Sequence, residues 1–234
     1  MNFRDIINIQ IPEGNVIKIT DSNGVVIWGE YPSLPELTDD PKLPEPLGNQ
    51  LHYISSDNEV INIDSDYIVS NKYENDLGTI AFDSGIASIP SYLFLDCTKL
   101  RQVKFPEGVN TISSGAFANT SIKFLSFPNS LEYINTQAFA ECNSLTTLVI
   151  DENIKSIQRA AFYLCGHLGL IICKAKTAPT IYSGVNTFFA TFEGVGAFLK
   201  GEKFLYVPKG SKGYEQGEWK KQLLDKGYQL IYYR

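Results

Sequence analysis

The sequence has no long apolar run and little positive charge. No stretch of about 18 consecutive apolar residues, the length that crosses a membrane as a helix, occurs among the 234 residues. The first residues contain no uninterrupted apolar core and carry Asp5 early, so they are not expected to form a signal peptide. The 20 Lys and Arg residues face 26 Asp and Glu residues, a net charge of −6, whereas nucleic-acid binding requires a dense basic face. The sequence therefore predicts neither a membrane span nor a nucleic-acid partner.

Residues that carry chemistry are also scarce. The sequence contains no zinc-protease motif, P-loop, nucleophile elbow or complete dinucleotide-binding motif. Its two histidines, His52 and His167, fall in an expected strand and an expected turn, where they are interpreted as surface or packing residues. Residues 64–66 place two aspartates close together but lack the glycine and the distal glutamate of a calcium loop. We therefore expect no catalytic, cofactor-binding or metal-binding residue, and a protein that is not an enzyme.

What the sequence does contain is a repeat of 22–23 residues between Ile86 and Cys173. Its marker is a phenylalanine that recurs four times, surrounded by apolar residues at fixed offsets. The recurring positions are Phe94, Phe117, Phe139 and Phe162; Ile86, Val109, Leu131 and Ile154; Ile89, Ile112, Ile134 and Ile157; Leu100, Ile122, Leu145 and Leu168; Val103, Leu125, Leu148 and Ile171; and Phe105, Phe127, Ile150 and Cys173. A period of this length indicates a solenoid, in which stacking of the repeats makes one continuous core.

Three of the four cysteines share one position of this repeat. Cys97, Cys142 and Cys165 each follow the phenylalanine by three residues, where the second repeat has Thr120. Because the sequence has no Cys-x-x-Cys pair, zinc ligation is not expected. Buried free thiols are the main interpretation. A disulfide between Cys142 and Cys165 is the alternative, since adjacent coils bring equivalent positions close together.

The repeat has the form V-x-x-I-x-x-x-A-F-x-x-C-x-x-L-x-x-V-x-F-P, as residues 109–127 and 131–150 illustrate. Further matching segments are residues 50–57, 68–75 and 205–208, with Tyr214 and Trp219. In these features the chain resembles the BspA-like class of bacterial leucine-rich repeats. The resemblance implies a right-handed leucine-rich-repeat solenoid of the α/β type, rich in strands, with short helical or turn segments.

The chain is expected to have three parts. Residues 1–30 are expected to form a small β hairpin element around an Asn-Gly turn. Residues 31–48 hold five prolines and are expected to form a semi-rigid linker. Residues 49–234 are expected to form the solenoid. Its expected parts are an N-terminal cap with a partial repeat in residues 49–85, four repeats in residues 86–173 and a C-terminal cap in residues 174–234.

Two details of the caps are predicted from short patterns. Leu77, Ile80 and Phe82 match the repeat strand at a shift of 23 residues, which predicts a partial repeat before the first full one. After residue 173 the period fails. A short helix is expected to begin after Ser211 and to end at Gly227.

The strand of each repeat offers a candidate binding surface. Side chains on either side of the inward Val-type position point away from the core. These residues are Gln102, Lys104, Phe124, Ser126, Thr147, Val149, Leu170 and Ile172, a stripe that is polar at its start and apolar towards the C-terminus. Either the C-terminal cap or the loop at residues 182–202 covers the apolar members, or a partner binds them as an exposed patch. In the second case Phe124 is the expected anchor.

These features predict a non-enzymatic protein-binding or adhesion module, presented on a short stalk. The alternative is a structural component of a larger surface appendage or phage-type particle, docked through residues 1–30. The expected partner is a protein, such as a host or matrix protein, or a glycan, and no cofactor is expected. The family resemblance implies a location at the cell surface or outside the cell, although no signal peptide is recognised.

Overall fold

A computed structural model describes residues 43–182, 192, 194–197, 199 and 201–233, together with the backbone of two short strands. Those strands, Ile19–Thr20 (β1) and Val26–Trp28 (β2), pair antiparallel. The rest of the expected N-terminal element, and residues 31–42 of the expected linker, lie outside the described residues. Residues 43–48 are described and contact the solenoid. Pro44 O accepts a hydrogen bond from Nδ1 of His52 at 2.9 Å, so contacts with the N-terminal cap include a residue before the expected boundary at residue 49.

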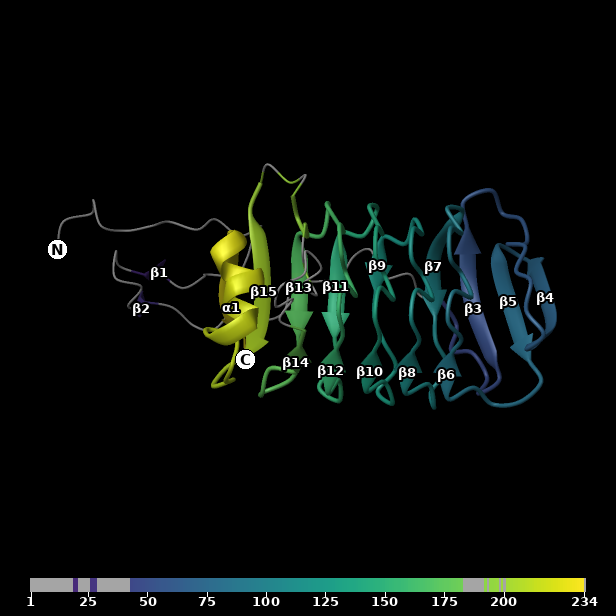
Figure 1. Ribbon diagram of the computed structural model, residues 1–234, viewed down its shortest axis with the longest axis horizontal. Helices are drawn as coiled ribbons and strands as arrows, with labels where there is room; N and C mark the ends of the chain where they lie inside the picture. The colour runs from purple at the N-terminus through teal and green to yellow at the C-terminus, as the bar shows by residue number, and fades with distance from the viewer. Residues whose placement is uncertain are drawn as a thin grey trace.

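The repeats form coils whose strands stack into two parallel sheets (Figure 1). One sheet contains Thr180–Ile181 (β14), Ser156–Ile157 (β12), Tyr133–Ile134 (β10), Thr111–Ile112 (β8) and Ser88–Ile89 (β6). The other contains Tyr228–Tyr233 (β16), Lys203–Pro208 (β15), Leu170–Cys173 (β13), Thr147–Ile150 (β11) and Phe124–Leu125 (β9). Equivalent residues of successive coils lie opposite each other, as Leu148 and Ile171 do. The solenoid prediction is confirmed.

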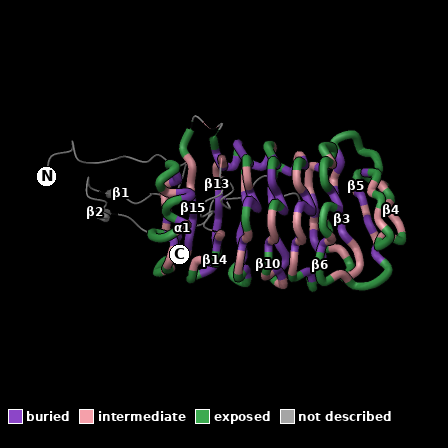
Figure 2. The backbone as a smooth tube through the Cα atoms, in the orientation of Figure 1, coloured by how far each residue is buried: buried purple, intermediate pink, exposed green. Residues whose placement is uncertain are grey.

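The predicted core positions belong to one apolar cluster, and Figure 2 shows buried residues recurring along the coils. Phe94, Phe117, Phe139 and Phe162 are fully buried, and their rings stack in order with centroid separations of 4.8, 5.2 and 5.5 Å. The stack continues onto Phe192, whose ring lies 5.5 Å from that of Phe162 at an interplanar angle of 7°. Stacked aromatic rings add to the energy of apolar burial, so one column of rings joins five successive coils.

The coils continue beyond residue 173, where four repeats were expected to end. Both β14 and β15 extend the two parallel sheets, and Phe192 between them extends the ring column. Residues 182–202 separate β14 from β15, whereas residues 158–169 separate β12 from β13. This longer connection breaks the spacing of 22–23 residues. The last coil therefore does not appear in the sequence as a further repeat of that spacing.

The turn at each repeat phenylalanine uses left-handed backbone conformations. Positive φ angles occur two residues before and two residues after each ring, at Tyr92, Asp96, Gly115, Asn119, Gln137, Glu141, Ala160 and Leu164. This alternation lets the N–H of Phe94 donate to Ala116 O, and that of Phe117 to Ala138 O, both at 2.8 Å. A third ladder of hydrogen bonds therefore runs along the solenoid. Gly115, with φ of 63°, suits this position, and a Cβ there would lie 2.5 Å from the exposed Tyr92 ring and displace it.

The N-terminal cap is an antiparallel sheet and not a partial coil. It contains Ile68–Glu74 (β4), Leu77–Phe82 (β5), Gln50–Ser55 (β3) and the first repeat strand Leu100–Lys104 (β7), in that order. Ile80 and Phe82 are buried, but β5 runs antiparallel to β3, and β3 separates it from β7. The segment that begins at Leu77 is thus a hairpin strand of the cap and does not stack on β7 as a parallel repeat strand. A hairpin strand and a repeat strand share the same alternation of apolar residues, so the pattern did not distinguish them.

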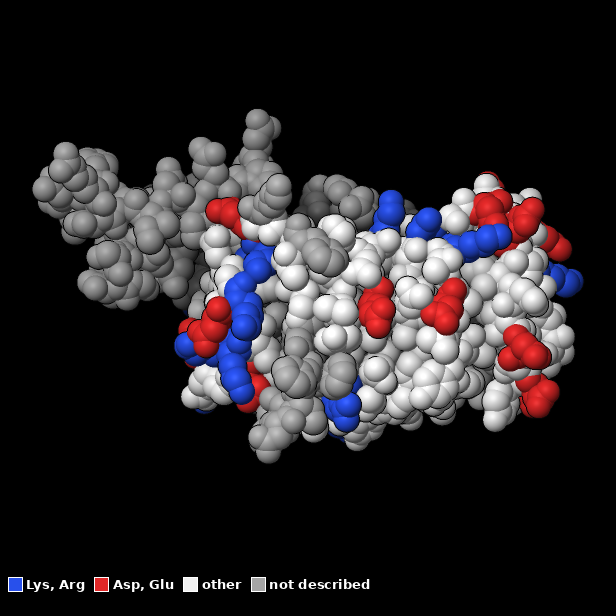
Figure 3. Space-filling model, turned by 45° about the horizontal axis from the view of Figure 1, so that its top comes forward, with Lys and Arg blue, Asp and Glu red and all other residues white. Residues whose placement is uncertain are grey.

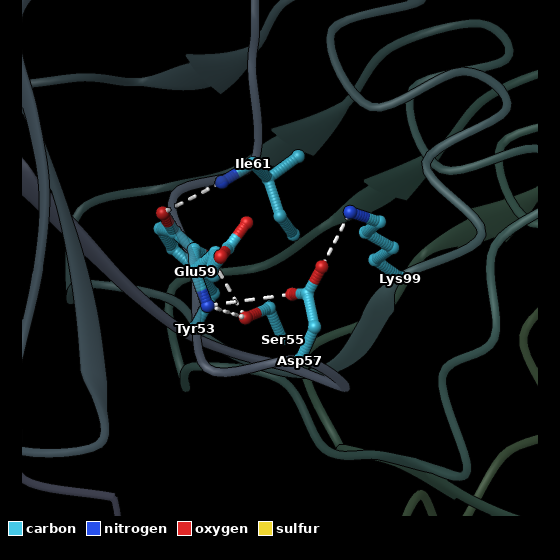
Figure 4. Close-up of polar contacts among 6 residues, drawn as sticks. All are labelled: Tyr53, Ser55, Asp57, Glu59, Ile61 and Lys99. Atoms are coloured by element: carbon cyan, nitrogen blue, oxygen red, sulfur yellow. Dashed lines mark hydrogen bonds and ion pairs between the residues drawn. The ribbon is translucent and has the colours of Figure 1, made fainter.

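Polar contacts hold the cap loop and connect it to the first coil (Figure 4). The Tyr53 hydroxyl accepts a hydrogen bond from the Ile61 N–H at 3.2 Å and donates one to Asn71 Oδ1 at 2.9 Å. Asp57 of the cap forms an ion pair with Lys99 of the first coil. The hydrogen bond from Lys99 holds the pKa of the Asp57 carboxyl below its ordinary value. The exposed pair fixes the orientation of the loop and contributes little energy.

The C-terminal cap combines β16 with one short helix. The helix Gly217–Gln222 (α1) begins later than expected from Ser211, and a 3-10 turn at Leu224–Lys226 follows it. Gly227 ends this segment in the left-handed conformation, as predicted, with φ of 94°. The buried Trp219 donates from Nε1 to Pro179 O at 2.8 Å, which anchors the helix to the last coil. No helix of the described segments is long and apolar enough to cross a membrane.

Candidate binding face

The eight residues of the predicted stripe lie on one face of the strands. We call this surface, on the outward side of β7, β9, β11, β13 and β15, the outer face. Its residues in β9, β11 and β13 are in register across the coils. Phe124 lies opposite Thr147, and Thr147 lies opposite Leu170. In the neighbouring row, Val149 lies opposite Ile172. The sheet therefore turns a sequence periodicity into two straight rows of side chains.

The apolar half of the outer face is a second core. Phe124, Val149 and Ile172 are buried, and they form a cluster separate from the main one. The cluster also includes Tyr206, Ile231 and Tyr233, with Leu170 and Phe204 packed against it. The expectation of Phe124 as an exposed anchor is corrected, because its side chain is only 5% exposed. Sequence reasoning missed Tyr206 and Ile231, since β15 and β16 do not follow the period.

The polar half of the outer face is less buried than the apolar half. Gln102, Lys104, Ser126 and Thr147 are each half-buried, with side chains on the outward side of β7, β9 and β11. Lys104 forms an ion pair with Glu45 at 2.8 Å. The Glu45 side chain is more exposed than the Lys104 side chain. These side chains lie on a backbone held by coil-to-coil hydrogen bonds. They are therefore presented on a rigid surface.

A groove of about 500 Å³ adjoins the polar half, at the carboxyl ends of the strands. Lys104 and Ser126 belong to both the groove and the stripe, and Glu107, Asp151 and Lys174 extend it across the next coils. The Asp151 carboxylate is 6% exposed and accepts hydrogen bonds at 2.8 Å from Lys174 Nζ and from the Glu152 N–H. Buried charges are retained when they are paired in this way.

Asp151 and Lys174 were not singled out by the sequence analysis. Each directly follows the last inward residue of its repeat strand, Ile150 and Cys173. A charged residue at that position in two successive repeats was the available signal. This position lies just beyond the alternating strand positions that define the stripe.

The structure does not bring the two histidines together. His52 is buried in the N-terminal cap, where Nδ1 donates to Pro44 O at 2.9 Å. His167 lies on the surface of a later coil, where Nδ1 donates to Asn143 O at 2.7 Å. Both interactions position the ring against backbone. In the described ranges, no group of three or more His, Cys, Asp or Glu residues is arranged to hold a metal ion.

The four cysteines are free thiols. Cys142 Sγ donates to Phe117 O and Cys165 Sγ donates to Phe139 O, both at 3.2 Å, so each thiol contacts the phenylalanine carbonyl of the preceding coil. Burial raises the pKa of the Cys165 thiol, which disfavours the reactive thiolate. At Cys142 and Cys165 the repeat position therefore holds a small side chain that donates a hydrogen bond.

The family follows from comparison with known proteins. The family model described as BspA type Leucine rich repeat region (6 copies) matches residues 50–187, more than half of the chain. The chain belongs to the BspA-type leucine-rich repeat family. The match spans β3 to β14 and thus includes the coil beyond residue 173. Comparison with curated proteins and with solved structures finds no match.

BspA-type repeats set the broad functional class. The family is commonly associated with surfaces and adhesion, and a leucine-rich-repeat solenoid typically serves as a scaffold for protein interaction. In such scaffolds the extended sheet is the surface on which partners bind, because neighbouring repeats display their side chains side by side. The corresponding sheet surface in this chain is the outer face.

Proposed function

We propose that this BspA-type solenoid is a non-enzymatic protein-binding or adhesion module whose partner contacts the polar half of the outer face and the adjoining groove. One observation carries the proposal. The half-buried residues Lys104 and Ser126 belong both to the predicted stripe and to the groove. A partner that follows the stripe therefore also reaches the groove.

The rigidity of this surface supports a binding role. Ordering of side chains and loops is a large part of the free-energy cost of association. Here the strands are fixed on the inward side by the buried ring column and on the outward side by the apolar cluster. The polar half lies between the N-terminal cap and that cluster, so little backbone remains to be ordered when a partner binds.

The charges of the groove favour selectivity. Lys104 and Lys174 are each paired with a carboxylate, at Glu45 and Asp151. A partner must offer groups that replace or extend these pairs, because displaced charges left without a partner cost binding energy. The groove therefore discriminates among protein or glycan surfaces by the placement of their polar groups.

The structural role in a larger appendage remains a prediction. It depends on residues 1–30, of which only the backbone of β1 and β2 lies within the described residues. A protein lacking those residues should still bind its partner if the outer face is the binding site.

The proposal is tested with an array of purified surface and matrix proteins and with a glycan array. Lys104→Glu should weaken binding to the captured partner by roughly tenfold, because it reverses a charge within the contact. Lys155→Glu is the matched control. Lys155 also forms one ion pair, with Glu132 at 2.7 Å, but it lies next to β12 in the opposite sheet. Equal weakening by both variants, or no saturable binding on either array, would refute the proposed site.

A further inference from the structure

The solenoid has an open edge at its first coil. β6 is the terminal strand of its sheet, and among the described strands it pairs only with β8. The antiparallel cap covers the other sheet, through β3 and β7, and leaves this edge open. Figure 1 shows β6 beside the cap, at the end of its row of short strands. Unpaired backbone at a sheet edge is a template for an additional chain.

The first coil presents a row of free carbonyl acceptors at this end. In every later coil described, the carbonyls next to the repeat phenylalanine accept hydrogen bonds from the coil before, as Ala116 O does from the Phe94 N–H at 2.8 Å. No described residue precedes the first coil in this ladder, and none donates to its equivalent carbonyls. Those carbonyls belong to Ser91, Leu93 and Leu95.

The same edge is poor in donors. In the second coil the Ser113 N–H donates to Ile89 O at 3.1 Å. The register that pairs Ile89 with Ile112 places Pro90 at the equivalent position of the first coil, and proline has no N–H. An edge that offers acceptors and few donors does not pair with a copy of itself.

The opposite end of the solenoid is closed to such stacking. The N–H of Phe192, which would donate to a following coil, donates instead to Gln222 Oε1 of α1 at 3.1 Å. The last coil of a second molecule is therefore capped by its own helix. The open edge requires a partner that brings its own donors.

A groove of about 550 Å³ lies along this edge. It is lined on one side by β6 and the following turn and on the other by cap residues that include Tyr67, Asp83 and Ser84. Tyr67 is 60% exposed. Exposed aromatic rings of this kind accept the aliphatic stems and cationic groups of Lys and Arg side chains.

The charge of the whole chain is concentrated at this end. Residues 57–99 contain eight Asp and Glu residues against Lys72 and Lys99, a sum of −6, which equals the net charge of all 234 residues. Figure 3 shows acidic side chains over the right-hand end, which is formed by the cap sheet. Such a field attracts cationic partners and repels anionic ones.

We propose that the open edge of the first coil binds an extended, Lys- and Arg-rich peptide segment of another protein. The backbone N–H groups of the segment and its cationic side chains donate to the free carbonyls, as in the addition of a strand to a sheet edge. Asp83 pairs with a basic side chain, and Tyr67 contacts its stem. This site is separate from the outer face and does not depend on the function proposed for it.

The experiment measures fluorescence anisotropy of three labelled peptides of equal length. The first alternates arginine and threonine, the second replaces each arginine by glutamine, and the third replaces each threonine by proline, which keeps the charge but removes backbone donors. The wild-type protein should bind the first peptide saturably and the other two at least about tenfold more weakly. Ser84→Trp, which fills the groove from an exposed position, should weaken binding of the first peptide to a similar degree.

Charge reversal separates the edge from the general field. Asp83→Lys should weaken the arginine peptide, whereas Glu152→Lys, at an exposed site on a distant coil, should leave binding nearly unchanged. Equal binding of the proline peptide, or no effect of Ser84→Trp, would overturn the proposal in favour of nonspecific charge attraction. Self-association of the wild-type protein that Ser84→Trp abolishes would overturn it in favour of a second copy at this edge.

Discussion

Each repeat phenylalanine acts through the two rings that flank it. Phe139 is fully buried between Phe117 and Phe162, at centroid distances of 5.2 and 5.5 Å. Phe139→Ala removes both contacts and leaves a cavity, so the free energy of unfolding should fall by about 3–5 kcal/mol. Chemical denaturation measures this change. Val69→Ala, at a residue 68% exposed, should shift it by less than about 0.5 kcal/mol, and equal effects would contradict the stacked core.

Buried acidic groups of the last coils predict a loss of stability in alkali. Burial raises the pKa of the Cys173 thiol from 9.0 to about 11 and that of the Tyr233 hydroxyl from 10.0 to about 12. Burial also raises the pKa of Tyr214 and of Tyr228. The folded chain therefore holds these protons more tightly than the unfolded chain does. The stability they contribute is complete below about pH 9 and declines as pH rises through the unfolded-state pKa values.

The measurement is the denaturation midpoint as a function of pH. The midpoint should decrease continuously between pH 9 and 11. Tyrosinate absorbance should rise at a higher pH in the folded than in the unfolded protein. A midpoint that stays constant across this range would show that these groups ionise equally in both states.

At the scale of elements, α1 caps the donor end of the last coil. Gln222 accepts from the Phe192 N–H at 3.1 Å and donates from Nε2 to Tyr182 O at 2.8 Å. Gln222→Ala leaves both backbone groups without this partner, so the free energy of unfolding should fall by about 1–3 kcal/mol. Gln216→Ala is the control, because this exposed residue precedes the helix and makes no side-chain cap. Thermal denaturation that fails to separate the two variants would contradict the capping role.

The elements that the sequence predicted are those that repeat. The inward positions of the four repeats, from Ile89 to Ile171, are buried as expected, because each must pack against the same position of the next coil. Because the packing requirement is the same in each coil, these apolar residues recur at a constant spacing in the sequence. The BspA-type pattern was accordingly sufficient to predict the solenoid.

The elements that the sequence did not predict are those at the ends. Phe192 lies in the connection at residues 182–202, whose length breaks the repeat spacing. The hairpin strand β5, with Ile80 and Phe82, has the same apolar alternation as a repeat strand. The outer face shows the same division. Its rows follow from strand alternation, but the burial of Phe124 depends on the apolar cluster that β15 and β16 continue at the C-terminal end. Contacts between segments that do not repeat leave no periodic signal.

At the scale of the whole molecule, the solenoid presents two surfaces of different chemistry. The polar half of the outer face carries paired charges of both signs beside a groove, at Lys104 and Asp151 among others. The first-coil edge is acidic and rich in carbonyl acceptors. Because the surfaces use different groups, salt should weaken a basic peptide at the edge more than a partner on the outer face. Titration of each interaction at increasing ionic strength tests this difference.

Amide hydrogen exchange with and without the partner found on the arrays tests the proposed binding face most directly. Binding should slow exchange in peptides that cover residues 100–105, 124–127 and 147–151, and leave β8, β10 and β12 of the opposite sheet unchanged. Protection confined to that opposite sheet, or spread equally over both sheets, would contradict the proposal that the outer face is the binding surface of this BspA-type protein.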